Sequence, residues 1–152
     1  ILLKPPYLSE KESIEDAVKS AIDAAPHVDK ISINPVNVQN NTVVEKLWFR
    51  NEWTAPWLWS VIEVLRKCED LPIRVYSDPT GGGTRRGAHN CHDCNKKVLE
   101  ALKNHRLGLG NLKGLHCNCK SRWNTLVQQS KLRRNGSEPH GYRSGFAGSR
   151  HF

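Results

Sequence analysis

Two pairs of cysteines carry the strongest chemical signal in this sequence. Two residues separate Cys91 from Cys94, one separates Cys117 from Cys119, and 22 lie between the pairs. Two thiolates so close along the chain can chelate one ion, and a second pair completes a tetrahedral shell. The spacing favours a structural zinc ion, with an iron–sulfur centre, another metal or free thiols as alternatives. Three neighbouring histidines offer nitrogen ligands that could replace a thiolate: His89, His92 and His116.

A set of amide side chains follows an apolar stretch earlier in the chain. Ile31 and Ile33 alternate with polar residues, which is typical of a strand. A loop follows and leads to a helix-start signal at Thr42. The amide side chains of this loop are Asn34, Asn37, Gln39 and Asn40. Loops at strand ends often carry the ligand sites of α/β proteins, and a helix N-terminus favours an anionic group. The alternative is an ordered loop whose amides satisfy its own backbone.

Strands and helices alternate in the apolar pattern. We expect strands at 1–3, 30–34 and 73–76, and helices at 9–25, 42–50, 57–69, 95–105 and 121–132. Ser9 with Glu12, and Thr42 with Glu45, have the spacing of capping boxes. Such alternation implies βαβ units and a parallel sheet. Because three units do not close a barrel, the fold class we predict is α/β, as part of a larger barrel.

Charge divides the chain into two parts. The net charge of the 152 residues is +8; residues 1–84 hold 9 Lys/Arg and 12 Asp/Glu, whereas residues 85–152 hold 14 and 3. This asymmetry is typical of a polyanion-binding module on a more neutral body, with a solvated basic tail as the alternative. We therefore predict an α/β part (1–79), a Gly/Arg linker (80–87), a basic four-cysteine module (88–132) and a disordered tail (133–152).

The remaining features restrict the class of protein. Cys68 stands alone in a helical run, where a cysteine is usually a small core residue. The sequence starts at Ile1 and has no methionine, so we expect a piece of a longer protein. Neither an apolar run of the ~20 residues that span a bilayer nor a secretory leader is present. We expect a soluble, cytoplasmic protein without a membrane partner.

Three stretches resemble one family. They resemble the later part of elongator-type radical SAM proteins, and most closely the archaeal radical SAM family of archaeosine biosynthesis in tRNA. The stretches are LLKPPYLSEKESIEDAVKSA, DKISINPVNVQNNTVVEKLW and APWLWSVIEVL. CHDC, CNC and the following Trp123 are similar to the C-terminal segment of that family. The resemblance covers roughly residues 1–125.

The resemblance implies a fold and an activity. The chain would hold the later βα units of a partial (β/α)6 radical SAM barrel, plus the small basic cysteine-containing module. The family cleaves S-adenosylmethionine at a [4Fe–4S] cluster to a 5′-deoxyadenosyl radical. In this branch, with a lysine-transferring partner enzyme, the radical reaction releases the amidine of the modified base in tRNA. The cluster motif Cys-x3-Cys-x2-Cys is absent, so its ligands would lie outside this chain, and the fragment alone would be inactive.

The resemblance also implies site residues. Asn34, Gln39 and Thr42 would face the cofactor or substrate from the strand-end loop, with Lys4 at the end of the preceding strand. The catalytic hydrogen-transfer residues are not assigned. The basic module would bind tRNA, with zinc on its four cysteines. Two other hypotheses stay open: a non-catalytic zinc-containing RNA-binding protein on an α/β scaffold, and an α/β-barrel enzyme fragment with an unrelated substrate.

Overall fold

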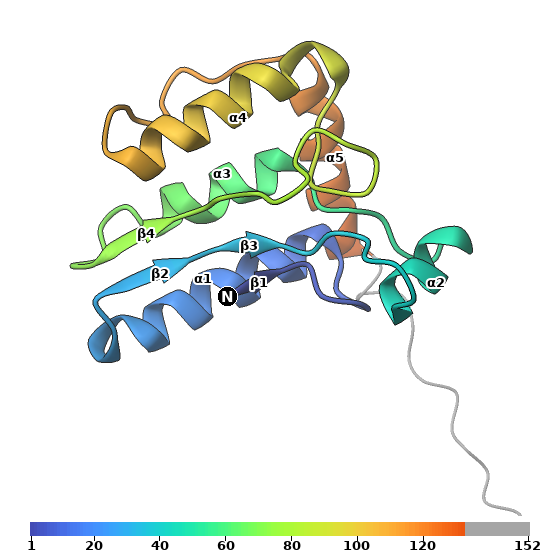
Figure 1. The fold of residues 1–152 in the computed structure, drawn as a ribbon, viewed down its shortest axis with the longest axis horizontal. Coiled ribbons are helices and arrows are strands. Elements are labelled where there is room, and N and C mark those ends of the chain that lie inside the picture. The colour runs from blue at the N-terminus through green and yellow to red at the C-terminus, as the bar shows by residue number, and fades with distance from the viewer. Residues whose placement is uncertain (133–152) are drawn as a thin grey trace, which may run out of the picture.

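The computed structural model describes residues 1–132, and the tail predicted at 133–152 lies outside the described residues. Its elements alternate as expected (Figure 1). In chain order they are β1 (Leu2–Leu3), α1 (Glu10–Ala24), η1 (Ala25–His27), β2 (Lys30–Ser32), β3 (Asn34–Pro35), α2 (Val43–Phe49), α3 (Leu58–Lys67), β4 (Arg74–Tyr76), α4 (His92–Leu107) and α5 (Cys119–Leu132). No helix within residues 1–132 is long and apolar enough to cross a membrane.

The strands pair in parallel, as the βαβ pattern predicts. β1 pairs with β3, and β2 pairs with β4. β2 and β3 are separated by Ile33 alone, whose N–H donates to Tyr76 O at 2.8 Å, while the next N–H, of Asn34, donates to Ile1 O at 2.8 Å. The segment 30–35 is therefore a central strand that bonds to β1 on one side and to β4 on the other.

One face of this small sheet is buried and the other is open. Leu3, Ile33 and Val75 point into the core, whereas Leu2, Asn34 and Arg74 are exposed. α1 and α3 follow successive strands and pack against each other, as right-handed crossovers to a common face require. A partial (β/α)6 radical SAM barrel stays a prediction, because the described strands form an open sheet and not a barrel.

The two predicted capping boxes differ. At α1 the box is complete: Glu12 N–H donates to Ser9 Oγ at 3.3 Å, and Ser9 N–H donates to Glu12 Oε2 at 2.9 Å. At α2, Thr42 Oγ1 accepts from Glu45 N–H at 3.1 Å, but the Glu45 carboxylate accepts from Asn41 N–H at 2.8 Å. The second box is therefore only half formed, because Glu45 also pairs with Arg86.

A continuous core crosses the predicted boundary between the α/β part and the basic module. Its buried residues come from both sides: Leu3, Ile14, Ile33, Leu58, Val61 and Leu65, then Cys94, Val98, Leu102, Cys119 and Trp123. The predicted linker is also packed. Gly83 N–H donates to Ala88 O at 2.8 Å, and a side-chain carbon at Gly87 would collide with the carbonyl of Gly81. The domain boundaries stay a prediction, but the two parts share one core.

The helices of the basic module extend further than predicted. α4 begins at His92, three residues before the expected start, because Cys91 is its N-cap and Cys94 lies in its first turn. It ends at Leu107 and is capped by Gly108, whose φ of 72° suits the left-handed cap position that glycine favours. α5 begins at Cys119. The fold thus places three of the four predicted metal ligands at helix N-termini.

Candidate metal centre and strand-end site

The structure brings the four predicted cysteine ligands together. The Sγ atoms of Cys91, Cys94, Cys117 and Cys119 all lie within 4.8 Å of one another. Cys91 Sγ is 3.6 Å from Cys94 Sγ and 3.5 Å from Cys117 Sγ, and Cys94 Sγ is 3.6 Å from Cys119 Sγ. All four thiols are free. The two short motifs therefore meet at one point, where α4 begins and α5 follows.

This donor set fits a single tetrahedral ion. Zn–S bonds of ~2.3 Å at the tetrahedral angle place neighbouring sulfurs roughly 3.8 Å apart, close to the separations seen here. A four-iron cluster binds its cysteines through four different irons and spreads them more widely. Within residues 1–132, no histidine joins the group of four cysteines that could hold a metal. The Nδ1 atom of the nearby His89 lies 2.8 Å from the backbone oxygen of Gly87. The four thiols could thus hold one zinc ion.

The thiols of the cluster differ in acidity. Burial opposes ionisation of Cys91, but hydrogen bonds with Cys117, with the Cys94 backbone and with the other thiols lower its pKa to about 7. Burial raises the pKa of Cys94, and its bond to Cys91 raises it further. The thiolate is the form that binds metals, so the lowered pKa of Cys91 favours its role as a ligand.

Trp59 connects the cysteine cluster to the α/β part. Its indole Nε1–H donates to Cys119 Sγ at 3.3 Å, and the side chain is 1% exposed. The ammonium of Lys120 lies 5.2 Å from the Trp59 ring centroid. An N–H donor to a ligating sulfur orients it and stabilises its negative charge. Helix α3 therefore supplies an outer contact to the centre.

The next residue of α3 joins a second buried network. Ser60 Oγ accepts from Trp123 Nε1–H at 2.8 Å and donates to Glu10 Oε1 at 2.6 Å. Glu10 Oε1 also accepts from Trp57 N–H at 2.8 Å. The carboxylate of α1 thus holds α3 directly and α5 through Ser60.

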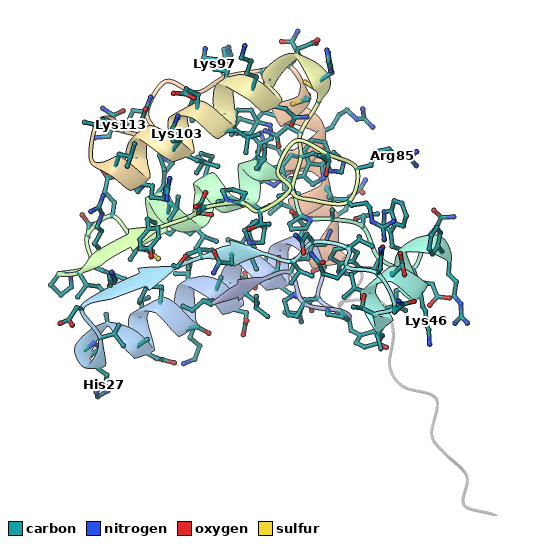
Figure 2. The ribbon with its side chains drawn as sticks, viewed as in Figure 1. His27, Lys46, Arg85, Lys97, Lys103 and Lys113 are labelled. Atoms are coloured by element: carbon teal, nitrogen blue, oxygen red, sulfur yellow. The ribbon has the colours of Figure 1, made fainter. Side chains whose placement is uncertain are left out.

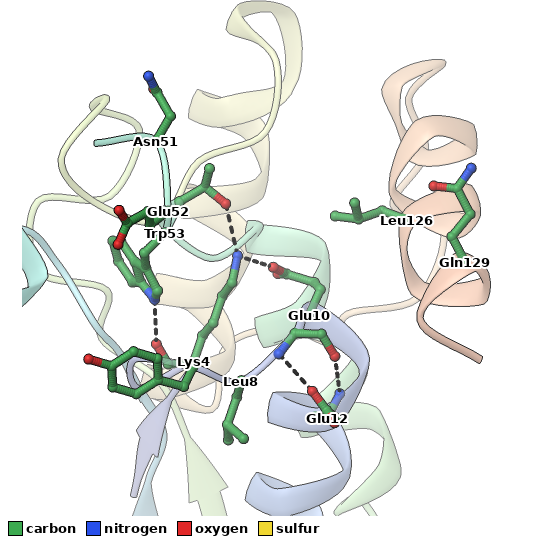
Figure 3. A pocket seen from close by; sticks show the side chains of 12 residues that line it. Lys4, Leu8, Glu10, Glu12, Asn51, Glu52, Trp53, Leu126 and Gln129 are labelled. Carbon is green, nitrogen blue, oxygen red and sulfur yellow. Dashed lines mark hydrogen bonds and ion pairs between the residues drawn. The ribbon is translucent and has the colours of Figure 1, made fainter. Parts of the chain in front are cut away.

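Lys4 completes this network and lines a pocket. Its Nζ lies 2.6 Å from Glu10 Oε2 and donates to Thr54 Oγ1 at 3.0 Å, and the residue is 5% exposed (Figure 3). Trp53 Nε1–H donates to Lys4 O at 3.3 Å. The pocket of about 670 Å³ is lined by residues of the loop between β1 and α1, of α1, of α5 and of the loop before α3: Lys4, Tyr7, Leu8, Ser9, Glu10, Glu12, Asn51, Glu52, Trp53, Thr54, Leu126 and Gln129.

The backbone beside this pocket is strained. Lys4, Tyr7 and Asn51 have φ values of 61°, 73° and 56°, in the left-handed region that non-glycine residues seldom adopt. Such conformations cost of order 1–3 kcal/mol each and persist only where surrounding contacts enforce them. For Lys4, the ion pair with Glu10 is such a contact.

The other predicted cofactor-binding residues lie apart from Lys4 and bond within their own loop. Gln39 Nε2–H donates to Asn37 Oδ1 at 2.7 Å, and Thr42 Oγ1–H donates to Gln39 O at 2.8 Å. Asn34, on the open sheet face, accepts from Ser32 Oγ–H at 3.0 Å. Asn34, Gln39 and Thr42 are absent from the lining of the Lys4 pocket. Of these contacts only that of Thr42 reaches the backbone of the loop, whereas Asn37 donates to Thr80 O and Asn40 accepts from Arg86. Cofactor binding by the predicted residues stays a prediction.

Sequence reasoning missed Glu10 and Ser60. A signal for Glu10 was present, because it continues the buried stripe of Ile14, Ala17 and Ala21 by one helical turn. A carboxylate on a buried stripe needs a partner. For Ser60, nothing in the sequence distinguishes a network hydroxyl from any other small residue of α3.

Comparison with known proteins gives two close matches. No protein-family profile and no solved structure matches the chain. The chain is 42% identical over 134 residues to a Methanosarcina acetivorans protein named archaeosine synthase subunit beta. It is 40% identical over 137 residues to the Thermococcus kodakarensis protein of the same name. These matches cover 84% and 87% of this chain.

A third relative is an uncharacterized protein of Methanocaldococcus jannaschii, 34% identical over 134 residues and 84% of this chain. The chain spans only 37% to 42% of the length of these three relatives. The similarity therefore concerns a part of each relative, and within this chain it extends over most of the length.

Proposed function

We propose that this chain is part of a tRNA-modifying enzyme of archaeosine formation. The observation that carries the proposal is the identity of 42% and 40%, over 84% and 87% of the chain, with two proteins named archaeosine synthase subunit beta. The words "subunit beta" in that name indicate a partner subunit, for which a lysine-transferring tRNA-modifying enzyme is the candidate. The complete protein would act together with that partner.

We further propose that the complete protein is a radical SAM enzyme. Parallel strands with α1 and α3 packed together on one face support this proposal, because a barrel is built from such units. When bound, the cluster and S-adenosylmethionine would supply the 5′-deoxyadenosyl radical. The compact four-thiol group suits one ion and not that cluster, and Lys4, Gln39 and Thr42 are engaged in internal bonds. The described residues of this chain would therefore support the fold and the tRNA contact, and the radical chemistry would take place on residues outside it.

The part we assign to this chain is tRNA binding through the zinc-stabilised helices α4 and α5. α4 and the residues around it carry exposed cations, of which Figure 2 labels Lys97, Lys103 and Lys113. Phosphate contacts by such side chains dominate the affinity of proteins for nucleic acids and weaken with salt. The metal centre would hold these helices against the α/β part.

The test uses the full-length protein, prepared without oxygen and with its partner subunit. We expect 5′-deoxyadenosine from S-adenosylmethionine and archaeosine in the tRNA, both measured by mass spectrometry. Absence of both products, in protein that carries an intact cluster, would contradict the proposal. A gene whose full length encodes no Cys-x3-Cys-x2-Cys motif would also contradict it.

A second candidate is a non-catalytic zinc-containing RNA-binding protein. The internal hydrogen bonds of the strand-end loop favour it, because they leave the predicted cofactor residues already partnered. Salt-dependent tRNA binding with one zinc per chain, and without cleavage of S-adenosylmethionine, would establish this second function.

A further inference from the structure

Helix α2 carries apolar and basic side chains on one exposed face. Val43 is 59% exposed and Phe49 67%, and Lys46 and Arg50 are also exposed. Residues three and four apart are neighbours on a helix surface, so Lys46 lies beside both Phe49 and Arg50. The opposite face buries Leu47 in a small cluster with Val38, Trp53 and Ala55. α2 is thus anchored on one side and open on the other.

The loop 80–87 adds a further cation to this surface. Arg85 is exposed, and its guanidinium lies 6.0 Å from the ring centroid of Trp48, which is itself 5.1 Å from that of Phe49. Lys46 and Arg85 lie at the end of the molecule where α2 stands (Figure 2). We define the α2 patch as Lys46, Trp48, Phe49, Arg50 and Arg85.

The neighbouring Arg86 also lies over the Trp48 ring, 5.2 Å from its centroid, but its charge is paired within the molecule. Arg86 pairs with Glu45 and donates to Val38 O at 3.2 Å and to Asn40 Oδ1 at 3.0 Å. The Asn41 N–H and then Arg86 lower the pKa of the Glu45 carboxyl, so it stays ionised and neutralises Arg86. Arg86 therefore fixes the loop that presents Arg85, whereas Lys46, Arg50 and Arg85 form no ion pair within residues 1–132 and can contact an external partner.

We propose that the α2 patch binds an unpaired segment of RNA, with a base stacked on Phe49 and phosphates held by Lys46, Arg50 and Arg85. This inference rests on the proposed function and adds a contact distinct from α4 and α5. Phe49 is an exposed ring beside Lys46 on the helix, and Arg50 and Arg85 are exposed at the same end of the molecule (Figure 2). Such a surface complements a polyanion with flat bases, because base–aromatic stacking with a basic surface is the common mode of single-strand recognition. A protein partner would need no such excess of positive charge.

The test measures RNA binding by the full-length, zinc-loaded protein across a salt series. The probes are an unmodified tRNA transcript, a short oligouridine and an RNA duplex of the same length as the oligouridine. We expect Phe49→Ala to weaken binding of the tRNA and of the oligouridine about tenfold, within the range known for base stacking, and to leave duplex binding unchanged. Because Phe49 is exposed, the substitution leaves the fold intact.

Two further substitutions separate stacking from apolar contact. Phe49→Tyr keeps an aromatic face and should retain the affinity, whereas Phe49→Leu keeps apolar area alone and should not. Lys46→Gln should lower the slope of log affinity against log salt by about 0.7 for the oligouridine, the value expected for one lost phosphate contact. The matched control is Ile22→Ala on α1, a side chain of similar exposure, at 51%, which should bind RNA normally.

The outcomes distinguish this inference from the proposed function. Equal binding of the oligouridine by the unsubstituted protein and by Phe49→Ala would overturn the α2 patch as an RNA site and leave the proposed function intact. Full retention by Phe49→Leu would also overturn it, because an apolar surface for a protein would then suffice. Absence of all RNA binding by the unsubstituted protein would overturn the proposed function together with this inference.

Discussion

The four-cysteine centre and the strand-end loop are both polar, but their side chains are bonded in different ways. In the loop, Gln39 donates to Asn37 and Thr42 donates to Gln39, so strong hydrogen bonds are already made. In the centre, the sulfurs face one another at 3.5 to 3.6 Å, and thiols form only weak hydrogen bonds. A cation would stabilise the centre far more than the loop.

The four-cysteine centre shares helix α3 with the buried Lys4–Glu10 ion pair. Helix α3 bonds to the centre through Trp59 and to the Lys4–Glu10 ion pair through Ser60. The centre and the Lys4–Glu10 ion pair therefore position the same helix, one through metal ligands and the other through buried charge. Substitutions in the centre, in the ion pair and in the loop should separate these contributions.

The largest expected effect is loss of the metal. Cys94→Ser should remove zinc from the protein and lower the free energy of unfolding by several kcal/mol, because binding to a structural site contributes directly to folding. Zinc content and the thermal unfolding midpoint measure this. The matched control is Cys68→Ala, a buried cysteine outside the centre, which should keep its zinc. Zinc retained by Cys94→Ser would contradict the four-thiol assignment.

The next effect concerns the buried ion pair. Glu10→Gln should lower the free energy of unfolding by about 3 kcal/mol, because it leaves the Lys4 ammonium buried without a counter-charge. Urea unfolding measures the change. Glu63→Gln, which disrupts the surface pair with Lys67 at 3.6 Å, should change stability by less than about 1 kcal/mol. Equal effects of the two substitutions would show that burial of the first pair is unimportant.

A smaller effect is expected at the junction of the two regions. Trp59→Phe keeps an aromatic ring, though a smaller one, but removes the N–H that donates to Cys119. Outer contacts of this kind typically change metal affinity about 10- to 100-fold. Competition with a zinc chelator measures the affinity. The neighbouring Trp57→Phe serves as the control and should leave zinc binding unchanged. An unchanged zinc affinity in Trp59→Phe would show that the hydrogen bond from α3 contributes nothing to metal binding.

The smallest effect on stability is expected in the strand-end loop. Gln39→Ala should cost less than about 1 kcal/mol, because its bond to Asn37 is exposed. The same variant in the full-length enzyme tests the predicted cofactor role. A marked loss of S-adenosylmethionine binding at unchanged stability would show that the loop is a ligand site, and unchanged binding would count against Gln39.

Local spacing made some of these features predictable. The capping box of Ser9 and Glu12 and the cysteine pairs follow from residues a few positions apart, and the structure forms both. The Lys4–Glu10–Ser60 network could not be predicted, because Ser60 lies 50 positions from Glu10. Loop 80–87 was predicted as a flexible linker from its glycines. In the structure, close backbone contact, as between Gly81 and Gly87, gives a sufficient reason for them.

In our account one zinc ion fixes the basic helices on the α/β part, and its ligands are Cys91, Cys94, Cys117 and Cys119. Elemental analysis of the purified full-length protein, combined with a count of reactive thiols, tests it most directly. We predict one zinc per chain, with these four thiols becoming reactive only after a chelator removes the metal. Zinc-free protein that is fully folded, with the four thiols reactive from the start, would contradict the claim.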